Sequence, residues 1–104
     1  MAKVSQKVNY LEIALNLVGK KYGLLIIDSI SSNKNKRRFN QILKDIPSSN
    51  PRIVSMRLKE MEKNGLITKQ LVLGAQVRTE YSLTDKAEQL TNAISSLKKW
   101  ASSN

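Results

Sequence analysis

Apolar residues recur at helical spacing along most of the chain and alternate like a strand in one region. From Asn9 to Gly19 they follow steps of three and four, with Asn9 suited to cap a helix and Gly19 suited to end it. Residues 20–31 are apolar around most of the helical circumference, which is typical of a central core helix. We therefore expect two consecutive helices here.

The next segments are shorter. Residues 32–38 are predicted to form a charged turn, and a short helix is expected from about Asn40 to Asp45. Pro47 should end that helix, because the residue before a proline is pushed out of the helical region.

A helix with clear ends is predicted over residues 50–64. Asn50 can accept hydrogen bonds from the first backbone N–H groups, and Pro51 suits the first helical position because it lacks an N–H. Asn64 and Gly65 form the matching end, since glycine readily adopts the left-handed conformation.

After Gly65 the period changes from 3.6 to 2. The runs 66–73 and 77–83 alternate like strands and are joined by Gly74, Ala75 and Gln76, which predicts a β-hairpin, or wing, over about residues 66–83. A last helix is expected over about residues 84–101, with Thr84 as its cap.

This order of elements predicts a mainly α fold with a small β-hairpin, a winged helix-turn-helix. Residues 9–104 should form one domain, preceded by a flexible basic arm at residues 1–8.

The helix over 50–64 separates its residues into two faces. On a helical wheel Val54, Leu58 and Met61 form a core face, while the opposite stripe carries Arg52, Ser55, Met56, Lys59 and Lys63. An ordinary amphipathic helix with a solvated basic face would show the same pattern. The short helix before it and the hairpin after it favour a recognition helix, whose N-terminal residues reach base edges in the major groove.

Within that stripe the roles should differ. Arg52, Ser55 and Met56 are expected to face bases, and Lys59 and Lys63 to face phosphates. Arg57 lies at the edge of the core face, which favours a structural or backbone-contacting role. In the wing, Arg78 can enter the minor groove, unless it pairs with a cross-strand acid. The expected DNA-contacting set is completed by Asn50, Gln76, Arg37 and Arg38.

Composition narrows the class of function. The 104 residues carry a formal net charge of +10, which favours nucleic acid first and an anionic membrane second as partner. A lysine-rich source would also raise the charge. Without cysteine or histidine, the usual catalytic and metal-binding groups are missing, so we expect no enzyme activity, metal or cofactor. No segment is apolar enough to span a bilayer, so a cytoplasmic protein is expected.

Four motifs resemble the HxlR family of winged helix-turn-helix regulators, which is MarR-like. They occur in that family's order over about residues 9–100 and read LNLVGKKYGLLII, KRRFNQIL, IVSMRLKEMEKNGLI and VRTEYSLTDKAEQL. The resemblance implies a homodimer that binds operator DNA and regulates transcription.

The resemblance also implies dimerisation through the first and last helices, which agrees with their apolar stripes. The expected interface residues are Leu11, Leu15, Leu90, Ile94, Leu97 and Trp100, and an intramolecular core role is the alternative for each. Many members of the family sense oxidants through a cysteine just before the first helix. Asn9 occupies that position here, so the thiol mechanism is excluded.

The expected function is therefore sequence-specific binding of double-stranded DNA by a homodimeric transcriptional regulator. An architectural protein that coats DNA without sequence preference is the main alternative, and a winged helix that binds only proteins is a third.

Overall fold

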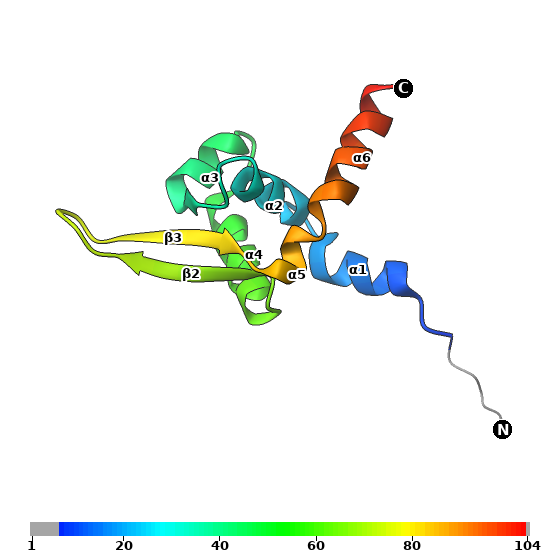
Figure 1. The fold of residues 1–104 in the computed structure, drawn as a ribbon, viewed down its shortest axis with the longest axis horizontal. Helices are drawn as coiled ribbons and strands as arrows, with labels where there is room; N and C mark the ends of the chain where they lie inside the picture. The colour runs from blue at the N-terminus through cyan, green and yellow to red at the C-terminus, as the bar shows by residue number, and fades with distance from the viewer. Residues whose placement is uncertain (1–6, 104) are drawn as a thin grey trace.

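The computed structural model describes residues 7–103. The elements follow the predicted order, with one short strand that was not predicted (Figure 1). They are α1 (Tyr10–Val18), α2 (Gly23–Ser31), β1 (Arg37–Arg38), α3 (Phe39–Asp45), α4 (Pro51–Lys63), β2 (Ile67–Val72), β3 (Arg78–Leu83), α5 (Asp85–Glu88) and α6 (Thr91–Ser102). Residues 1–6 of the expected arm lie outside the described residues.

Helix α2 is the centre of the core. Ile26, Ile27 and Ile30 are completely buried and belong to one cluster with residues of α3, α4, the sheet and α6. Leu25 is the exception, because its side chain is 53% exposed. The helix is therefore buried over most of its surface, with one apolar residue left at its outer edge.

Helices α3 and α4 form the helix-turn-helix, and α4 begins and ends as predicted. The Asn50 Oδ1 accepts hydrogen bonds from the N–H groups of Arg52 and Ile53, at 2.9 and 3.3 Å. At the other end, Gly65 has φ +75°, its N–H donates to the Glu62 carbonyl, and the next N–H donates to the Met61 carbonyl. This pair of bonds is a Schellman motif, which satisfies carbonyl groups that the helix leaves unpaired.

Strand β1 adds a third strand to the predicted hairpin. The sheet is antiparallel with the order β1-β3-β2, and Arg37 and Arg38 lie opposite Tyr81 and Glu80. The turn before β1 is fixed by Asn35, whose amide accepts from the Leu83 N–H at 2.6 Å and donates to the Leu83 carbonyl at 3.3 Å. The expected charged turn is thus anchored to the end of β3.

The C-terminal segment corrects the prediction of one helix over 84–101. Thr84 caps as expected, but the segment is divided into α5 and α6 by a turn at Gln89 and Leu90. The Leu90 N–H donates to the Ala87 carbonyl, three residues back, and this tighter turn redirects the chain. Both residues keep right-handed dihedral angles, so no glycine or proline marks the break.

Helices α1 and α6 extend from the body in different directions (Figure 1). The start of α6 is held by buried Ile94 and by an ion pair between the Lys98 Nζ and the Asp28 Oδ1, at 2.8 Å. The Lys98 side chain is 60% exposed, so this pair contributes little to stability.

A polar network joins α2, β1 and α3. Buried Ser29 donates to the Asp45 Oδ2 at 2.6 Å, and Arg37 binds both oxygens of the same carboxylate, at 3.0 and 2.9 Å. The hydrogen bond from Ser29 and then the bond and charge of Arg37 lower the pKa of Asp45, although burial opposes them. The ionised carboxylate therefore fixes the first helix of the motif.

Asp45→Asn should lower the free energy of unfolding by about 1–3 kcal/mol at pH 7, because bonds to the charged carboxylate are weakened. The folded-state pKa lies below the ordinary value of 3.8, so this stabilisation is present above that pH. It is lost as the pH falls from there through the folded-state value. Urea unfolding at several pH values measures the effect.

Asp28→Asn is the matched control, because it removes the same charge from an exposed ion pair and should cost less than about 1 kcal/mol. Equal losses from both substitutions, or an Asp45→Asn loss that persists unchanged below the folded-state pKa, would contradict the assigned network.

Candidate nucleic-acid interface

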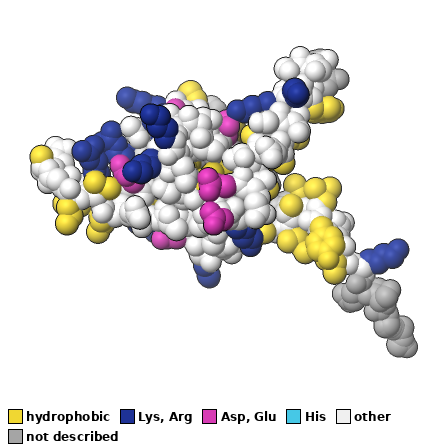
Figure 2. Space-filling view, viewed as in Figure 1, with side chains coloured by type: hydrophobic (Ala, Val, Ile, Leu, Met, Phe, Trp, Pro, Cys, Tyr) yellow, Lys and Arg dark blue, Asp and Glu magenta, His cyan; other side chains and the backbone are white. Residues whose placement is uncertain are grey.

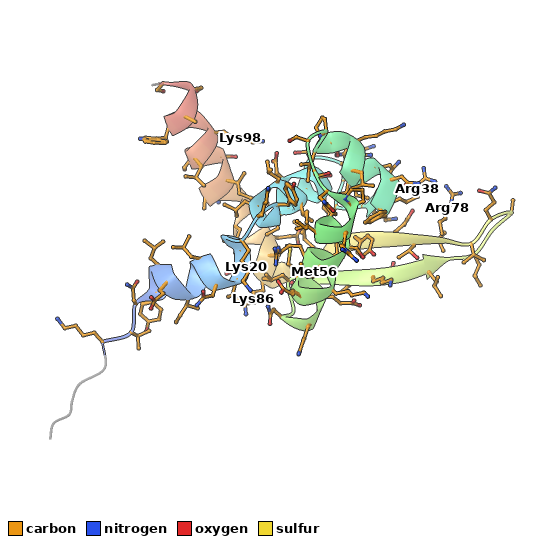
Figure 3. The ribbon with its side chains drawn as sticks, turned by 180° about the vertical axis from the view of Figure 1, so that it is seen from behind. Lys20, Arg38, Met56, Arg78, Lys86 and Lys98 are labelled. Carbon is orange, nitrogen blue, oxygen red and sulfur yellow. The ribbon has the colours of Figure 1, made fainter. Side chains whose placement is uncertain are left out.

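The two faces of α4 are separated as the helical wheel predicts. Val54, Leu58 and Met61 are buried in the core. The exposed face carries Arg52, Met56, Lys59 and Lys63, with Ser55 half-buried at its flank. In Figure 3, α4 lies on the near side of the molecule with Met56 on its outer surface, 49% exposed.

The N-terminal end of α4 is held by Tyr22, at the junction between α1 and α2. Its hydroxyl accepts from the Asn50 N–H at 3.2 Å and lies 3.5 Å from the Ser48 carbonyl, to which it donates. Tyr22 adopts φ +72°, which is rare for a bulky residue. The next residue must be small, since a Cβ on Gly23 would lie 2.5 Å from the Val18 carbonyl oxygen.

The middle of α4 is held by the same junction. Arg57 is only 8% exposed, and its Nε donates to the Lys21 carbonyl at 3.0 Å. Its Nη1 pairs with the Glu60 Oε1 at 2.6 Å, and Lys20 approaches the other oxygen of Glu60 at 3.8 Å. The hydrogen bond from Arg57 lowers the pKa of Glu60. Arg57 is therefore structural, as its edge position predicted.

The wing places several of the expected DNA-contacting residues on one surface beside α3. Gln76 and Arg78 are exposed and, with Arg38, line a shallow hollow between the hairpin and the start of α3. Arg38 and Arg78 lie close together in Figure 3. A neighbouring hollow adds Lys34 and Lys36 of the turn, which the sequence predicted only as solvated. Opposite Arg78 on β2 lies Val72 rather than an acid, and Glu80, two residues further along β3, lines that second hollow as well.

Two of the expected DNA-contacting residues use their side chains for bonds within the protein. Arg37 lies opposite Tyr81 on the inner face of the sheet, and its guanidinium is occupied by Asp45. Asn50 uses its side-chain oxygen for the helix cap. The structure also supplies residues that sequence reasoning missed, Tyr22 and Asn35. The unusual positive φ values at both could not be read from their residue types alone.

The expected dimer residues divide into two groups. Leu11, Leu15, Leu97 and Trp100 are 68%, 54%, 51% and 70% exposed. Ile94 is buried and Leu90 is half-buried against the core of the same chain. Tyr10 and Ile13 add further exposed apolar surface to α1.

No helix among the described residues is long and apolar enough to cross a membrane. Within the same residues, no group of three or more His, Cys, Asp or Glu side chains is placed to hold a metal ion.

A three-stranded wing beside a helix-turn-helix with an exposed basic helix defines a winged-helix protein of the DNA-binding class. The chain belongs to the HxlR-like helix-turn-helix family, whose model matches residues 17–104. The family and its relatives are transcriptional regulators, not enzymes, so the chain is a helix-turn-helix transcriptional regulator, for which DNA binding is implied.

Individual relatives agree with this assignment. The uncharacterised regulator YvaP of Bacillus subtilis is 33% identical over 90 residues, which cover 86% of this chain and 82% of YvaP. The reduced form of YodB from the same species has a TM-score of 0.77 at 29% identity, covering 92% of each chain. A MarR-family regulator from Porphyromonas gingivalis has a TM-score of 0.85 at 27% identity, covering 99% of each chain.

Arg57→Ala should lower the free energy of unfolding by about 2–3 kcal/mol, because it leaves the Lys21 carbonyl without its charged donor. Lys63→Ala, on the exposed face of the same helix, should change it by less than about 0.5 kcal/mol. Urea unfolding of both variants decides the point, and two equally small changes would show that Arg57 does not anchor α4.

Proposed function

We propose that the protein binds specific sequences in double-stranded DNA as a homodimer, with α4 in the major groove and the wing at the adjacent minor groove. The observation that carries this proposal is the exposed basic stripe of α4. The opposite face of the helix is buried in the core and is not available for binding. An α-helix fits the major groove, where each base pair presents a distinct pattern of donors and acceptors.

The position of each side chain along α4 suggests its role. Arg52 is in the first turn and exposed, which suits a bidentate bond to guanine. Ser55 can donate or accept, and Met56 can contact a thymine methyl group. Lys59 and Lys63 lie further along the stripe and are assigned to phosphates, which fix register but carry no sequence information.

The wing is assigned to the neighbouring minor groove and its phosphates. Arg78, Arg38 and Gln76 line one hollow between the hairpin and the start of α3. Arg37 is omitted from the contact set because its guanidinium is bound to Asp45. Asn50 is retained as the cap that positions the first turn of α4 rather than as a direct contact.

Helices α1 and α6 are assigned to the dimer interface, because both extend from the body and carry exposed apolar residues. Groups of exposed apolar side chains of this kind mark interaction sites in soluble proteins. Leu11, Leu15, Leu97 and Trp100 are the proposed contacts, with Leu90 and Ile94 supporting them from the core side. A dimer of this type binds half-sites about 34–36 Å apart.

An architectural role, in which the protein coats DNA without sequence preference, remains the second candidate because of the net charge of +10. Membership of a family of transcriptional regulators does not favour it.

The proposed regulation of transcription implies a cytoplasmic location. With no cysteine in its 104 residues, its response does not pass through a thiol of this chain.

Arg52→Ala should relax base preference at one position of each half-site and weaken binding to the preferred sequence by about 1–3 kcal/mol. Lys59→Ala should weaken binding to all sequences alike and reduce the salt slope by about one, because it removes one phosphate contact. Selection of bound duplexes from a random pool, followed by affinity measurements at several salt concentrations, gives both quantities.

Sequence-blind losses from both substitutions would remove Arg52 from base reading. A ratio near one between selected and random duplexes would favour the coating role. An affinity that barely changes with salt would exclude the phosphate contacts.

Leu97→Glu should shift the protein from dimer to monomer, because it places a charge within the proposed apolar interface. Ser95→Glu is the matched control, since Ser95 lies about 200° away on the same helix. Sedimentation equilibrium measures the mass of each variant. A dimer that survives Leu97→Glu, or that is lost equally with Ser95→Glu, would place the interface elsewhere.

A further inference from the structure

The wing carries an exposed apolar surface that its assigned contacts do not explain. Leu71, Leu73 and Val77 are 69%, 78% and 64% exposed. Figure 2 shows hydrophobic side chains gathered at the end of the hairpin, while lysine and arginine side chains lie nearer to the body. Such exposed aliphatic residues stand out on a hairpin assigned to a polyanion.

The strand register, continued by one residue towards the tip, places these residues on one face. Ile67 lies opposite Leu83 and Leu71 lies opposite Thr79, and buried Tyr81 falls between them on the same face. This is the face that packs against the core. Leu73 and Val77 are the next residues beyond Val72 and Arg78, the last pair of the register, and continued alternation puts them on the same face. We therefore name Leu71, Leu73 and Val77 the apolar wing face.

The opposite face of the wing is polar. It carries Gln70 opposite Glu80 and Val72 opposite Arg78, and Arg38 of β1 lies opposite Glu80 in the next row. In the part of the hairpin that extends beyond the core, the charged side chains therefore lie mainly on one face and the exposed apolar side chains on the other. On this side two cations, Lys69 of β2 and Arg37 of β1, flank Tyr81, and the Arg37 guanidinium is bound to Asp45.

The occupant of the apolar wing face must be narrow and negatively charged at its margins. A stable protein interface buries roughly 800 Å² per partner. An aromatic side chain buries about 150–250 Å², and each of these three aliphatic side chains is smaller. Together they therefore bury less than such an interface requires. The cations around them are Lys69 at the base and Arg38 and Arg78 on the far side. The minor groove has this form, with apolar sugar walls between two rows of phosphates.

We propose that the apolar wing face enters the minor groove of duplex DNA and wedges between base pairs, so that the DNA bends. This inference rests on the proposed function and extends it to the shape of the bound DNA. Aliphatic wedges of this kind partly unstack a base step and bend the duplex towards the major groove. The preferred sequences carry a flexible pyrimidine–purine step at the wing position, because such steps unstack most easily.

The test measures bending separately from binding. Duplexes of about 30 base pairs, selected from a random pool by the wild-type protein, carry fluorophores at both ends, and energy transfer reports the end-to-end distance. The wild-type protein shortens that distance. The triple variant Leu71→Ala, Leu73→Ala, Val77→Ala loses most of the shortening and about tenfold or more in affinity, while its salt slope is unchanged because no charge is removed.

Val72→Ala is the matched control, because it truncates an aliphatic residue on the opposite face of the same strand and should retain the bend. Thermal unfolding confirms that the triple variant folds, since its substitutions lie outside the core. Replacing the pyrimidine–purine step in the selected duplex should reduce wild-type affinity but leave that of the triple variant unchanged.

Three results would overturn the wedge. The first is binding of DNA by the wild-type protein without bending, and the second is full bending by the triple variant. The third is self-association of wild-type dimers in the absence of DNA, if the triple variant no longer self-associates. That result would make a second copy of the chain the partner of this face. If the wild-type protein binds no duplex in a salt-dependent manner, the proposed function fails, and the wedge fails with it.

Discussion

The position of the recognition helix depends on its attachment to residues 20–22, the junction between α1 and α2. Tyr22 binds the N-terminal end of α4 through the Asn50 N–H, the Lys21 carbonyl accepts from Arg57 in its middle, and Lys20 approaches Glu60. The core face of α4 belongs to the same buried cluster as α2, which begins at the same junction. These directional bonds add to the apolar packing and fix the position of α4 along its axis.

The parts of this arrangement that depend on local chemistry could be predicted from the sequence. The cap at Asn50 and the end at Gly65 each follow from residues within a few positions of one another, and the structure confirms both. The position of Arg57 at the edge of the core face also followed from the helical wheel, because the spacing of the apolar residues shows which side of α4 faces the core. The basic stripe of α4 is therefore visible in the sequence, whereas its assignment to bases and phosphates stays a proposal.

The parts that depend on distant residues could not be predicted. Strand β1 is only two residues long and exists because β3 pairs with it and Asn35 anchors the turn before it. In the sequence alone, Arg37 and Arg38 cannot be told apart, because the strand pairing is not known. In the structure Arg37 is bound to Asp45, whereas Arg38 lies on the opposite face of the sheet. The break between α5 and α6 was also hidden, because the apolar stripe continues across it without a helix-breaking residue.

The turn at Gln89 and Leu90 has a mechanical consequence. Helix α6 has 12 residues beyond that turn and is about 18 Å long. A rotation of about 10° at the turn therefore moves the far end of α6 by about 3 Å. The burial of Ile94 and the ion pair between Lys98 and Asp28 hold this angle. In the proposed dimer, the angle at this turn therefore determines how far apart the two recognition helices lie.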